Sequence, residues 1–338
     1  MNKNQYLEFY STYCWPILRK IVRKSNRCKM CILSDKYTKI TNGICSECLL
    51  YQKTEHKAIE TSAPSSEMTS NFNRLLNSIQ VDKKYHLLLM LSGGKDSAYI
   101  LDRLKIEFPK LKILCLFVNN GFSSTFATKN ASHVADKLQA DLIVSNDEVP
   151  SFYESFRKAF LSLNGQGSSG TVDYADGSKI FQIGNQVAKD FDIPYIIGGL
   201  SSTQVKQIIK TDGFIQENPN FPPILFPLAV WRTSEQDIRE HVRKKELLIK
   251  GSDNPIVSNN DLIITMSAID VLNNGYCSFE PEFAQMIREG KAERKTWLHN
   301  FELLEFATTR GLLNGDIKKT LSKLNLKTKD IVNHKQGA

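Results

Sequence analysis

Between Tyr85 and Val230 the sequence alternates short apolar runs with amphipathic segments. A run that is apolar throughout is expected of a strand covered on both faces of a parallel sheet. The alternation therefore predicts an α/β fold built on a doubly wound, parallel five-stranded sheet. The predicted strands are 86–91, 112–119, 141–146, 194–198 and 224–230, and helical patterns cover 97–108, 123–139, 151–163, 179–191 and 234–247.

The remaining sequence suggests three further parts. A stretch rich in Thr, Ser, Glu and Ala follows a cluster of cysteines, and after Asn254 the apolar residues recur at helical spacing. No apolar run approaches the ~20 residues needed to cross a membrane, and no secretory signal is visible, so we expect a cytoplasmic protein. The predicted parts are an N-terminal segment with four cysteines (1–55), a linker (56–80), a nucleotide-binding domain (81–250) and a helical C-terminal region (251–338).

The first predicted strand runs directly into the loop Ser92-Gly93-Gly94-Lys95-Asp96-Ser97, and a helical pattern follows. Two glycines leave the loop amides free to approach an anion, and the helix N-terminus adds unpaired N–H groups. Lys95 adds a full positive charge, and the two serines add hydroxyl donors. Asp96 has three open roles, which are to orient Lys95, to cap the helix or to hold Mg²⁺. The spacing differs from a Walker A loop, and an ordinary Gly-Gly turn is the simpler alternative.

On this loop the chain resembles the PP-loop ATP pyrophosphatase family, which has an adenine nucleotide alpha hydrolase-like fold. The resemblance implies that ATP is cleaved between its α and β phosphates, with Mg²⁺, and that a substrate carbonyl is activated as its adenylate. It implies catalytic roles for Lys95, Asp96 and Ser97. Residues expected to bind the nucleotide are Ser92, Gly93, Gly94, Lys95, Asp96, Ser97, Asn119 after the second strand, and Gly198 and Gly199 after the fourth.

Two Cys-x-x-Cys pairs, Cys28/Cys31 and Cys45/Cys48, are separated by thirteen residues. Four thiolates can close a tetrahedral shell around Zn²⁺, and a closed shell leaves no position for a substrate. We therefore expect a structural zinc ribbon. An iron–sulfur cluster and reduced cysteines without a metal are the alternatives.

A second glycine motif, Gly165-Gln-Gly-Ser-Ser-Gly170, matches a dinucleotide fingerprint by letter but follows a helical segment. Without its strand, turn and helix the match is weak, and we interpret these residues as a mobile loop over the active site.

Four stretches are more specifically similar to the N-acetyl sugar amidotransferases of bacterial surface polysaccharide synthesis. This resemblance implies that the acetamido oxygen of a UDP-N-acetyl sugar is adenylated and that ammonia, supplied by a separate glutaminase, then replaces AMP. The stretches are Gly43-Ile-Cys-Ser-Glu-Cys48 with Tyr51, Asn119-Asn-Gly-Phe122, Ile193-Pro-Tyr-Ile-Ile-Gly-Gly199, and Ile287-Arg-Glu-Gly290 with Arg294.

Two other functions remain open. In a tRNA-modifying enzyme of the same fold, the cysteine module and the basic segment Arg19–Lys29 would bind RNA, although the predicted pocket segment lacks the cysteines of tRNA thiolases. A non-catalytic nucleotide-binding subunit is the third possibility. Ser201, Ser202, Gln204 and Lys206 after the fourth strand could contact phosphate or substrate, and the alternative is that they only begin a helix. Arg288 and Arg294 in the tail could reach an anionic substrate, and solvated charge on a helix is the simpler alternative.

Overall fold

The computed structural model describes residues 9–55, 66–163, 167–250, 252 and 260–332. Its central sheet has the strand order β5-β4-β3-β6-β8-β7. The first five strands in this order are parallel, which confirms the predicted doubly wound α/β fold, and β7 pairs antiparallel with β8 at one edge. The strands are β3 (Leu87–Met90), β4 (Ile113–Val118), β5 (Asp141–Ser145), β6 (Tyr195–Ile197), β7 (Ile215–Asn218) and β8 (Phe221–Leu225).

The last predicted strand, 224–230, is correct only at residues 224 and 225. Strand β8 ends at Leu225, and α10 (Pro227–Trp231) follows with Pro227 in its first turn. Proline has no N–H for a strand ladder but suits the first turn of a helix, so the apolar run continues as a buried helix. The edge strand β7 was not predicted because Ile215-Gln-Glu-Asn218 is mostly polar.

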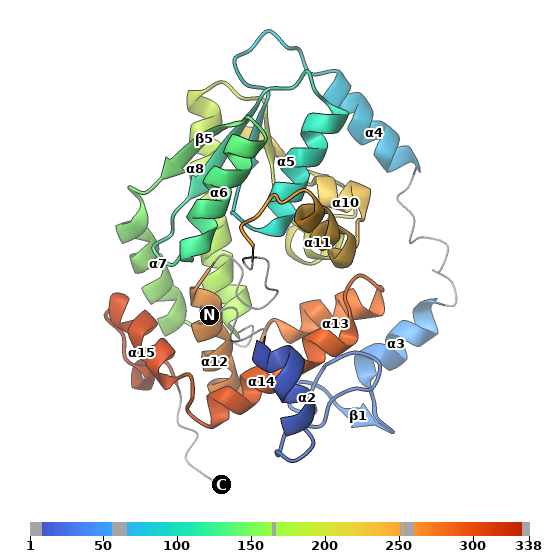
Figure 1. The fold of residues 1–338 in the computed structure, drawn as a ribbon, viewed down its shortest axis with the longest axis vertical. Helices are drawn as coiled ribbons and strands as arrows, with labels where there is room; N and C mark the ends of the chain where they lie inside the picture. Colours follow the sequence, from blue (N-terminus) through green and yellow to red (C-terminus); the bar gives the residue numbers. More distant parts are fainter. Residues whose placement is uncertain (1–8, 56–65, 164–166, 251, 253–259, 333–338) are drawn as a thin grey trace.

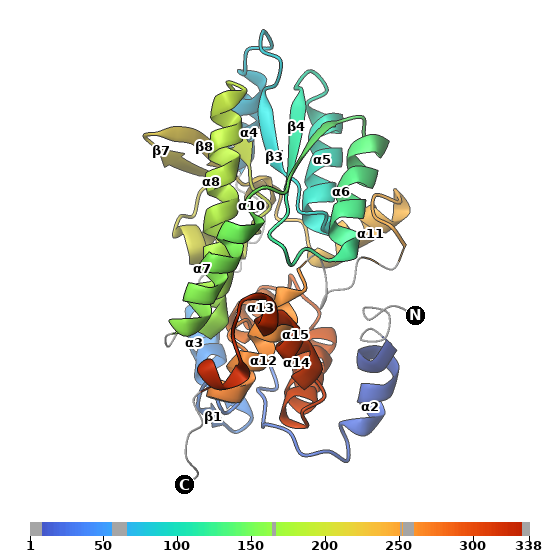
Figure 2. The same ribbon diagram turned by 90° about the vertical axis from the view of Figure 1, so that its left-hand side faces the viewer.

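Helices cover both faces of the sheet (Figure 2). Alternate residues of β3 point to opposite faces, so that Leu87 and Leu89 join one core and Leu88 and Met90 the other. The first core includes α5 (Lys95–Glu107), α6 (Thr125–Lys137) and α11 (Glu235–Lys244), and the second includes α7 (Val149–Leu161) and α8 (Tyr174–Asp190).

A helix, α4 (Ser66–Asn77), occupies part of the predicted linker 56–80. Its apolar residues are spaced to form one face, and Phe72 and Leu76 are buried in the first core. The other part of that segment, 56–65, lies outside the described residues.

The second lobe contains the predicted helical tail, which lies beside the N-terminal segment (Figure 1). In the tail are α12 (Leu262–Asn274), α13 (Glu280–Arg288), α14 (Arg294–Thr309), α15 (Asn314–Lys323) and the 3-10 helix η5 (Thr328–Asp330). In the N-terminal segment are the π-helix η1 (Tyr10–Cys14), α2 (Trp15–Leu18), the hairpin of β1 (Ile40–Thr41) and β2 (Ile44–Cys45), and α3 (Ser46–Glu55).

Charged contacts join these two parts of the second lobe. Arg19 pairs with Glu302 at 2.6 Å, and Arg27 pairs with Glu280 at 2.8 Å and with Glu305 at 2.9 Å. The cysteines share a hydrophobic cluster with residues of α13 and α14. The N-terminal segment and the tail therefore form a common core.

The predicted mobile loop at Gly165–Gly170 is replaced, in the part that the structure describes, by helix. Residues 167–170 lead into the π-helix η3 (Ser169–Asp173), which continues as α8. Ser168 donates a 2.8 Å hydrogen bond to the buried Asp270, which fixes this turn against α12. Residues 164–166 lie outside the described residues. Across the described parts of the chain, no helix has the length and apolarity to cross a membrane.

Candidate active site and metal centre

The glycine loop lies between β3 and α5, and its shape depends on Gly93. The φ angle of Gly93 is +73°, in the left-handed region that glycine tolerates best. A Cβ atom on this residue would lie 2.1 Å from the carbonyl oxygen of Ala127 in α6. Asn130 of α6 donates a 3.0 Å hydrogen bond to the Gly93 carbonyl. The loop is thus held against α6 by backbone contact that a larger residue would prevent.

The side chains of the loop are bonded to one another. Ser92 Oγ lies 3.2 Å from Ser97 Oγ and accepts the Gly94 N–H at 3.3 Å. Lys95 Nζ lies 2.9 Å from a carboxylate oxygen of Asp96. Of the three roles open to Asp96, the structure shows the orienting contact with Lys95. The N-cap of α5 is Gly94, so Asp96 does not cap the helix.

This loop lies where the order of the sheet reverses. Strand β3 pairs with β4 on one side and with β6 on the other. The chain leaves the carboxyl end of β3 toward β4 and leaves that of β6 toward β7 and β8, in the opposite direction. Open α/β sheets bind ligands in the crevice at such a switch point. The cleft found here is lined by Ser92, Gly94, Lys95 and Asp96 after β3, and by Gly199, Ser201, Ser202 and Gln204 after β6.

Of the other residues predicted to bind the nucleotide, Gly199 lines the cleft, and Gly198 and Asn119 do not. Gly199 has open space beside it, whereas a Cβ on Gly198 would lie 2.7 Å from the ring of Phe226. Gly198 is therefore a packing residue of the sheet. Asn119 lies outside the cleft lining and donates a 3.0 Å hydrogen bond to Asn146.

Some of the polar residues after β6 line the cleft and others do not. Ser201 caps α9 (Ser202–Gln204), and Gln204 completes the capping box. The chain continues as the π-helix η4 (Val205–Ile209). Lys206 is exposed, pairs with Asp212 at 3.3 Å and does not line the cleft.

The helical tail forms the opposite wall of the cleft, which the sequence analysis did not identify. Glu282, Phe283 and Met286 come from α13, Lys291 from the following turn, and Trp297 from α14. The rings of Phe283 and Trp297 stack, with centroids 3.6 Å apart and planes inclined by 26°. The sequence resemblance includes Ile287 and Arg288 at the end of α13 but not Glu282, Phe283 or Met286, which line the cleft.

Two hydrogen bonds attach this wall to the sheet. Lys291 Nζ donates to Ser202 Oγ at 2.8 Å, and Thr203 Oγ1 donates to Glu289 at 2.6 Å. Lys291 also pairs with Glu289. Since α9 directly follows β6, these bonds fix the end of α13 beside the glycine loop.

Acidic groups in the interior of this region have raised pKa values. Burial raises the pKa of Glu282 to about 7, although the amide of Gln204 partly opposes this. Burial, with the nearby charges of Asp176 and Glu282, raises the pKa of Asp173 to about 7. Burial raises the pKa of Asp176 to about 6 against the hydrogen bond from Asn120. Such shifts are common in functional sites.

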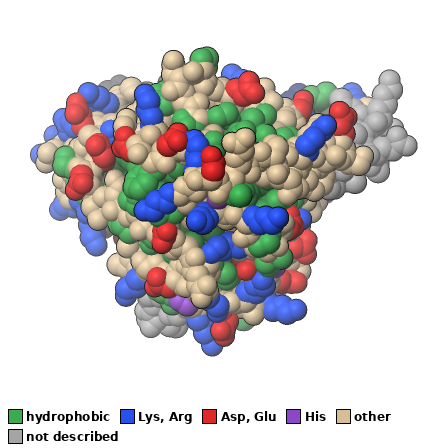
Figure 3. Space-filling view, turned by 90° about the horizontal axis from the view of Figure 1, so that it is seen from above, with side chains coloured by type: hydrophobic (Ala, Val, Ile, Leu, Met, Phe, Trp, Pro, Cys, Tyr) green, Lys and Arg blue, Asp and Glu red, His purple; other side chains and the backbone are tan. Residues whose placement is uncertain are grey.

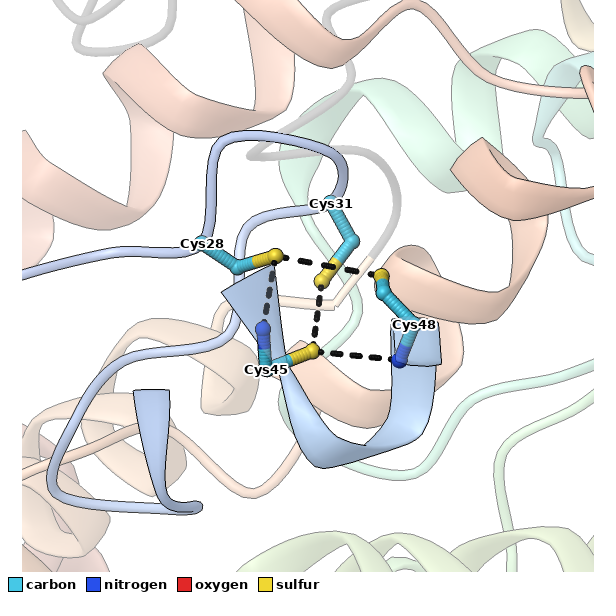
Figure 4. Close-up of side chains that lie close together, drawn as sticks. All are labelled: Cys28, Cys31, Cys45 and Cys48. Atoms are coloured by element: carbon cyan, nitrogen blue, oxygen red, sulfur yellow. Dashed lines mark hydrogen bonds between the residues drawn. The ribbon is translucent and has the colours of Figure 1, made fainter. Parts of the chain in front are cut away.

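The four clustered cysteines are buried, and their sulfurs point toward one another (Figure 4). All four sulfurs lie within 4.8 Å of one another, so this group could hold a metal ion. Backbone N–H groups of Leu33, Cys45 and Cys48 donate to the sulfurs at 3.3–3.5 Å, as expected where thiolates carry charge.

Arg288 and Arg294 contact this centre rather than the cleft. Arg294 donates to the carbonyl oxygens of Cys28 and Cys31, and Arg288 lies 4.0 Å from Cys48 Sγ. Neither arginine lines the cleft, and neither is a simple solvated charge, because both contact the cysteine centre. Tyr51 donates a 2.8 Å hydrogen bond to the Arg288 carbonyl. This bond connects two of the four stretches that are similar to the amidotransferases.

The basic segment Arg19–Lys29 is also partly neutralised, because Arg19 and Arg27 pair with tail glutamates. Elsewhere, on the face of the molecule drawn in Figure 3, basic and acidic side chains are interspersed.

The fold and the loop together define a doubly wound α/β protein with a glycine loop at its switch point. No protein-family model matches the chain. An uncharacterized protein of Methanocaldococcus jannaschii is 32% identical over 132 residues, which is 38% of this chain and 45% of that protein. The chain thus matches less than half the length of this relative.

Several solved structures are distantly similar. The U34-tRNA thiolase NcsA from Methanococcus maripaludis, solved with its [4Fe-4S] cluster, is 13% identical with a TM-score of 0.42, covering 86% of this chain and 87% of that chain. The NMN synthetase of Francisella tularensis is 14% identical with a TM-score of 0.39, covering 74% and 96%. The NH3-dependent NAD synthetase of Campylobacter jejuni is 12% identical with a TM-score of 0.37, covering 74% and 95%. These distant likenesses do not bear on the reaction of this chain.

Proposed function

We propose that the chain cleaves ATP to AMP and pyrophosphate in order to activate a substrate carbonyl as its adenylate, and then transfers nitrogen to the activated carbon. The observation that carries this proposal is the Ser92–Ser97 loop at the carboxyl end of β3, which shares one cleft with a wall of side chains from the tail. A phosphate loop on one side and an acceptor wall on the other is the arrangement that adenylation requires, because both reactants must meet in line.

In the first step the substrate oxygen attacks the α phosphorus, and the bond to the β phosphate breaks. The loop amides, the N-terminus of α5 and Lys95 are placed to stabilise the negative charge of the departing pyrophosphate. Ser92 lines the cleft and adds a hydroxyl, whereas Ser97 is buried beneath the loop and bonds to the Gly94 carbonyl. Asp96 offers a carboxylate that fits a Mg²⁺ ion, which would neutralise phosphate charge when bound.

The cleft has cationic groups on more than one wall. Lys95 comes from the loop and Arg232 from the residue after α10. Lys291, in the turn before α14, is paired with Glu289. Cations from two separate elements, Lys95 and Arg232, suit a substrate that carries phosphates at more than one point. This supports an acceptor that is itself a nucleotide, and we propose a UDP-N-acetyl sugar whose acetamido oxygen is adenylated. Ammonia supplied by a separate glutaminase would then replace AMP.

We propose that the cysteine centre holds a structural Zn²⁺. A tetrahedral ion with Zn–S bonds of about 2.3 Å places its sulfurs about 3.8 Å apart. The sulfurs of Cys28 and Cys48 are 3.8 Å apart, and those of Cys31 and Cys45 are 3.6 Å apart. This spacing supports one ion. Four protein ligands leave it no open position, so its contribution is to the packing of the second lobe.

The deciding experiment is product analysis of ATP breakdown with Mg²⁺, in the presence and absence of UDP-N-acetyl sugars and ammonium. AMP and pyrophosphate that depend on a sugar are the expected result, and ADP with phosphate would contradict the proposal. Stimulation by bulk tRNA instead of a sugar would indicate RNA modification, which the inward pairing of Arg19 and Arg27 disfavours. Partner binding without any ATP breakdown would indicate a non-catalytic subunit.

A further inference from the structure

The cleft contains one carboxylate without a cationic partner among its described lining residues. Asp96 pairs with Lys95, and Glu235 pairs with Arg239 at 2.6 Å. Glu282 has no ion pair within the described parts of the chain, although it lies in the same cleft as the glycine loop. Glu282 is half-buried, and removing a carboxylate from water without a counter-charge is costly, so this position is a candidate for a functional role.

The position of Glu282 is fixed by the contacts of α13. Two hydrogen bonds hold α13 against α9, one from Lys291 to Ser202 and one from Thr203 to Glu289. Gln204 of α9 is oriented too, since its Oε1 accepts the Ser201 N–H at 2.9 Å. Its Nε2 is therefore the atom available to donate to Glu282.

No cation on the neighbouring described elements pairs with Glu282. Asp173 of η3 is itself acidic, and Gln204 of α9 is uncharged. Lys291 is occupied by Glu289 and Ser202. Burial raises the pKa of Glu282 to about 7, although the hydrogen bond from Gln204 opposes this rise, and a carboxylate with this pKa can both accept and release a proton at neutral pH.

We propose that Glu282 is the catalytic base of the second half-reaction, which accepts the proton released by the nitrogen nucleophile. This assignment rests on the proposed function. Ammonia adds to the carbon of the adenylated amide, forming a C–N bond, and the nitrogen becomes positively charged. Glu282 takes one proton from that nitrogen, the C–O bond to AMP breaks with its electron pair leaving on the AMP oxygen, and the amidine remains.

The test compares Glu282→Gln with the wild-type enzyme in two assays. Sugar-dependent exchange of pyrophosphate into ATP measures adenylation, and amidine formation measures nitrogen transfer. The ratio of transfer to exchange with ammonium should fall about 100-fold, as is usual when a general base is removed. Hydroxylamine is largely uncharged at neutral pH and needs a base less, so it should recover most of the transfer. At a constant concentration of free ammonia, transfer by the wild type should rise with pH through about 7, and this limb should be absent from Glu282→Gln.

Glu235→Gln is the matched control, because Glu235 lines the same cleft but has a cationic partner. Its ratio of hydroxylamine to ammonia transfer should equal that of the wild type. An equal loss of exchange and transfer in Glu282→Gln, or an equal loss with both nucleophiles, would overturn the assignment in favour of a packing role. Absence of sugar-dependent exchange in the wild type would overturn the proposed function and this assignment together.

Discussion

Arg294 Nη2 donates a 2.6 Å hydrogen bond to the carbonyl oxygen of Cys28. A second bond, from Arg294 Nε to the carbonyl of Cys31, measures 2.7 Å. Both carbonyls belong to the first cysteine pair, and Arg294 begins α14. The helix that carries Trp297 into the cleft is therefore hydrogen-bonded directly to the loop that carries the first cysteine pair.

Loss of the metal should accordingly disturb the wall of the cleft as well as the cysteine module. Cys45→Ser removes one of four sulfurs, and we expect it to abolish binding of one metal ion per chain, measured by elemental analysis. The melting temperature should fall, because structural zinc contributes roughly 10–16 kcal/mol in small domains. Cys14→Ser is the control, since Cys14 lies outside the centre. Retention of full metal content by Cys45→Ser would contradict this ligand set.

Lys95→Ala should abolish most ATP cleavage without unfolding the protein. The lysine is placed to stabilise the charge of leaving pyrophosphate, and removing such a group costs about 100- to 1,000-fold in rate. The measurement is AMP release under saturating ATP, with a melting curve to confirm the fold. Lys206→Ala, an exposed lysine outside the cleft lining, should keep wild-type activity. Equal ATP cleavage by both variants would show that Lys95 of the glycine loop has no role in the reaction.

Gly93→Ala should destabilise the protein by at least about 2 kcal/mol in denaturant unfolding, because the new Cβ combines a left-handed φ angle with a clash against Ala127. Gly177→Ala is a matched comparison within α8, where a Cβ meets open space. That substitution should be neutral or stabilise by up to about 1 kcal/mol, as alanine favours a helix. A tolerated Gly93→Ala would show that the loop does not need this backbone shape.

The pH dependence of stability should reflect the buried carboxyl groups. The pKa of Asp173 is about 7 in the folded protein, above its ordinary value, so its stabilising contribution is complete below the unfolded pKa and is lost as pH rises through about 7. Asp173→Asn should therefore stabilise the protein more at pH 8 than at pH 5, by roughly 1–3 kcal/mol.

Chemical unfolding of Asp173→Asn at the two pH values makes this measurement. Asp147→Asn alters an exposed aspartate and should change stability little at either pH. A larger stabilising effect of Asp173→Asn at pH 5 would reverse the expected sign and rule out a raised pKa.

The features that the sequence predicted correctly are local ones. Buried parallel strands such as β3 and β4 are apolar throughout, and the glycine loop and cysteine pairs each lie within a short stretch. The wall formed by Glu282 and Phe283 was missed because it becomes part of the site only through contacts with α9, some 80 residues away. The positions of Arg288 and Arg294 could not be predicted for the same reason, since their partners lie in the distant N-terminal segment.

The pairing of Arg27 with Glu280 and Glu305 joins segments more than 250 residues apart in the chain. During synthesis on the ribosome, the cysteine segment emerges long before the helices that complete its core. The face of the sheet under α5, α6 and α11 can close first, because its core lies within residues 72–248, whereas the core on the other face also needs residues of α12 and α15. The cysteine segment must meanwhile remain unassembled or be held by its metal alone, and the cleft acquires its second wall only after the last helices have been made.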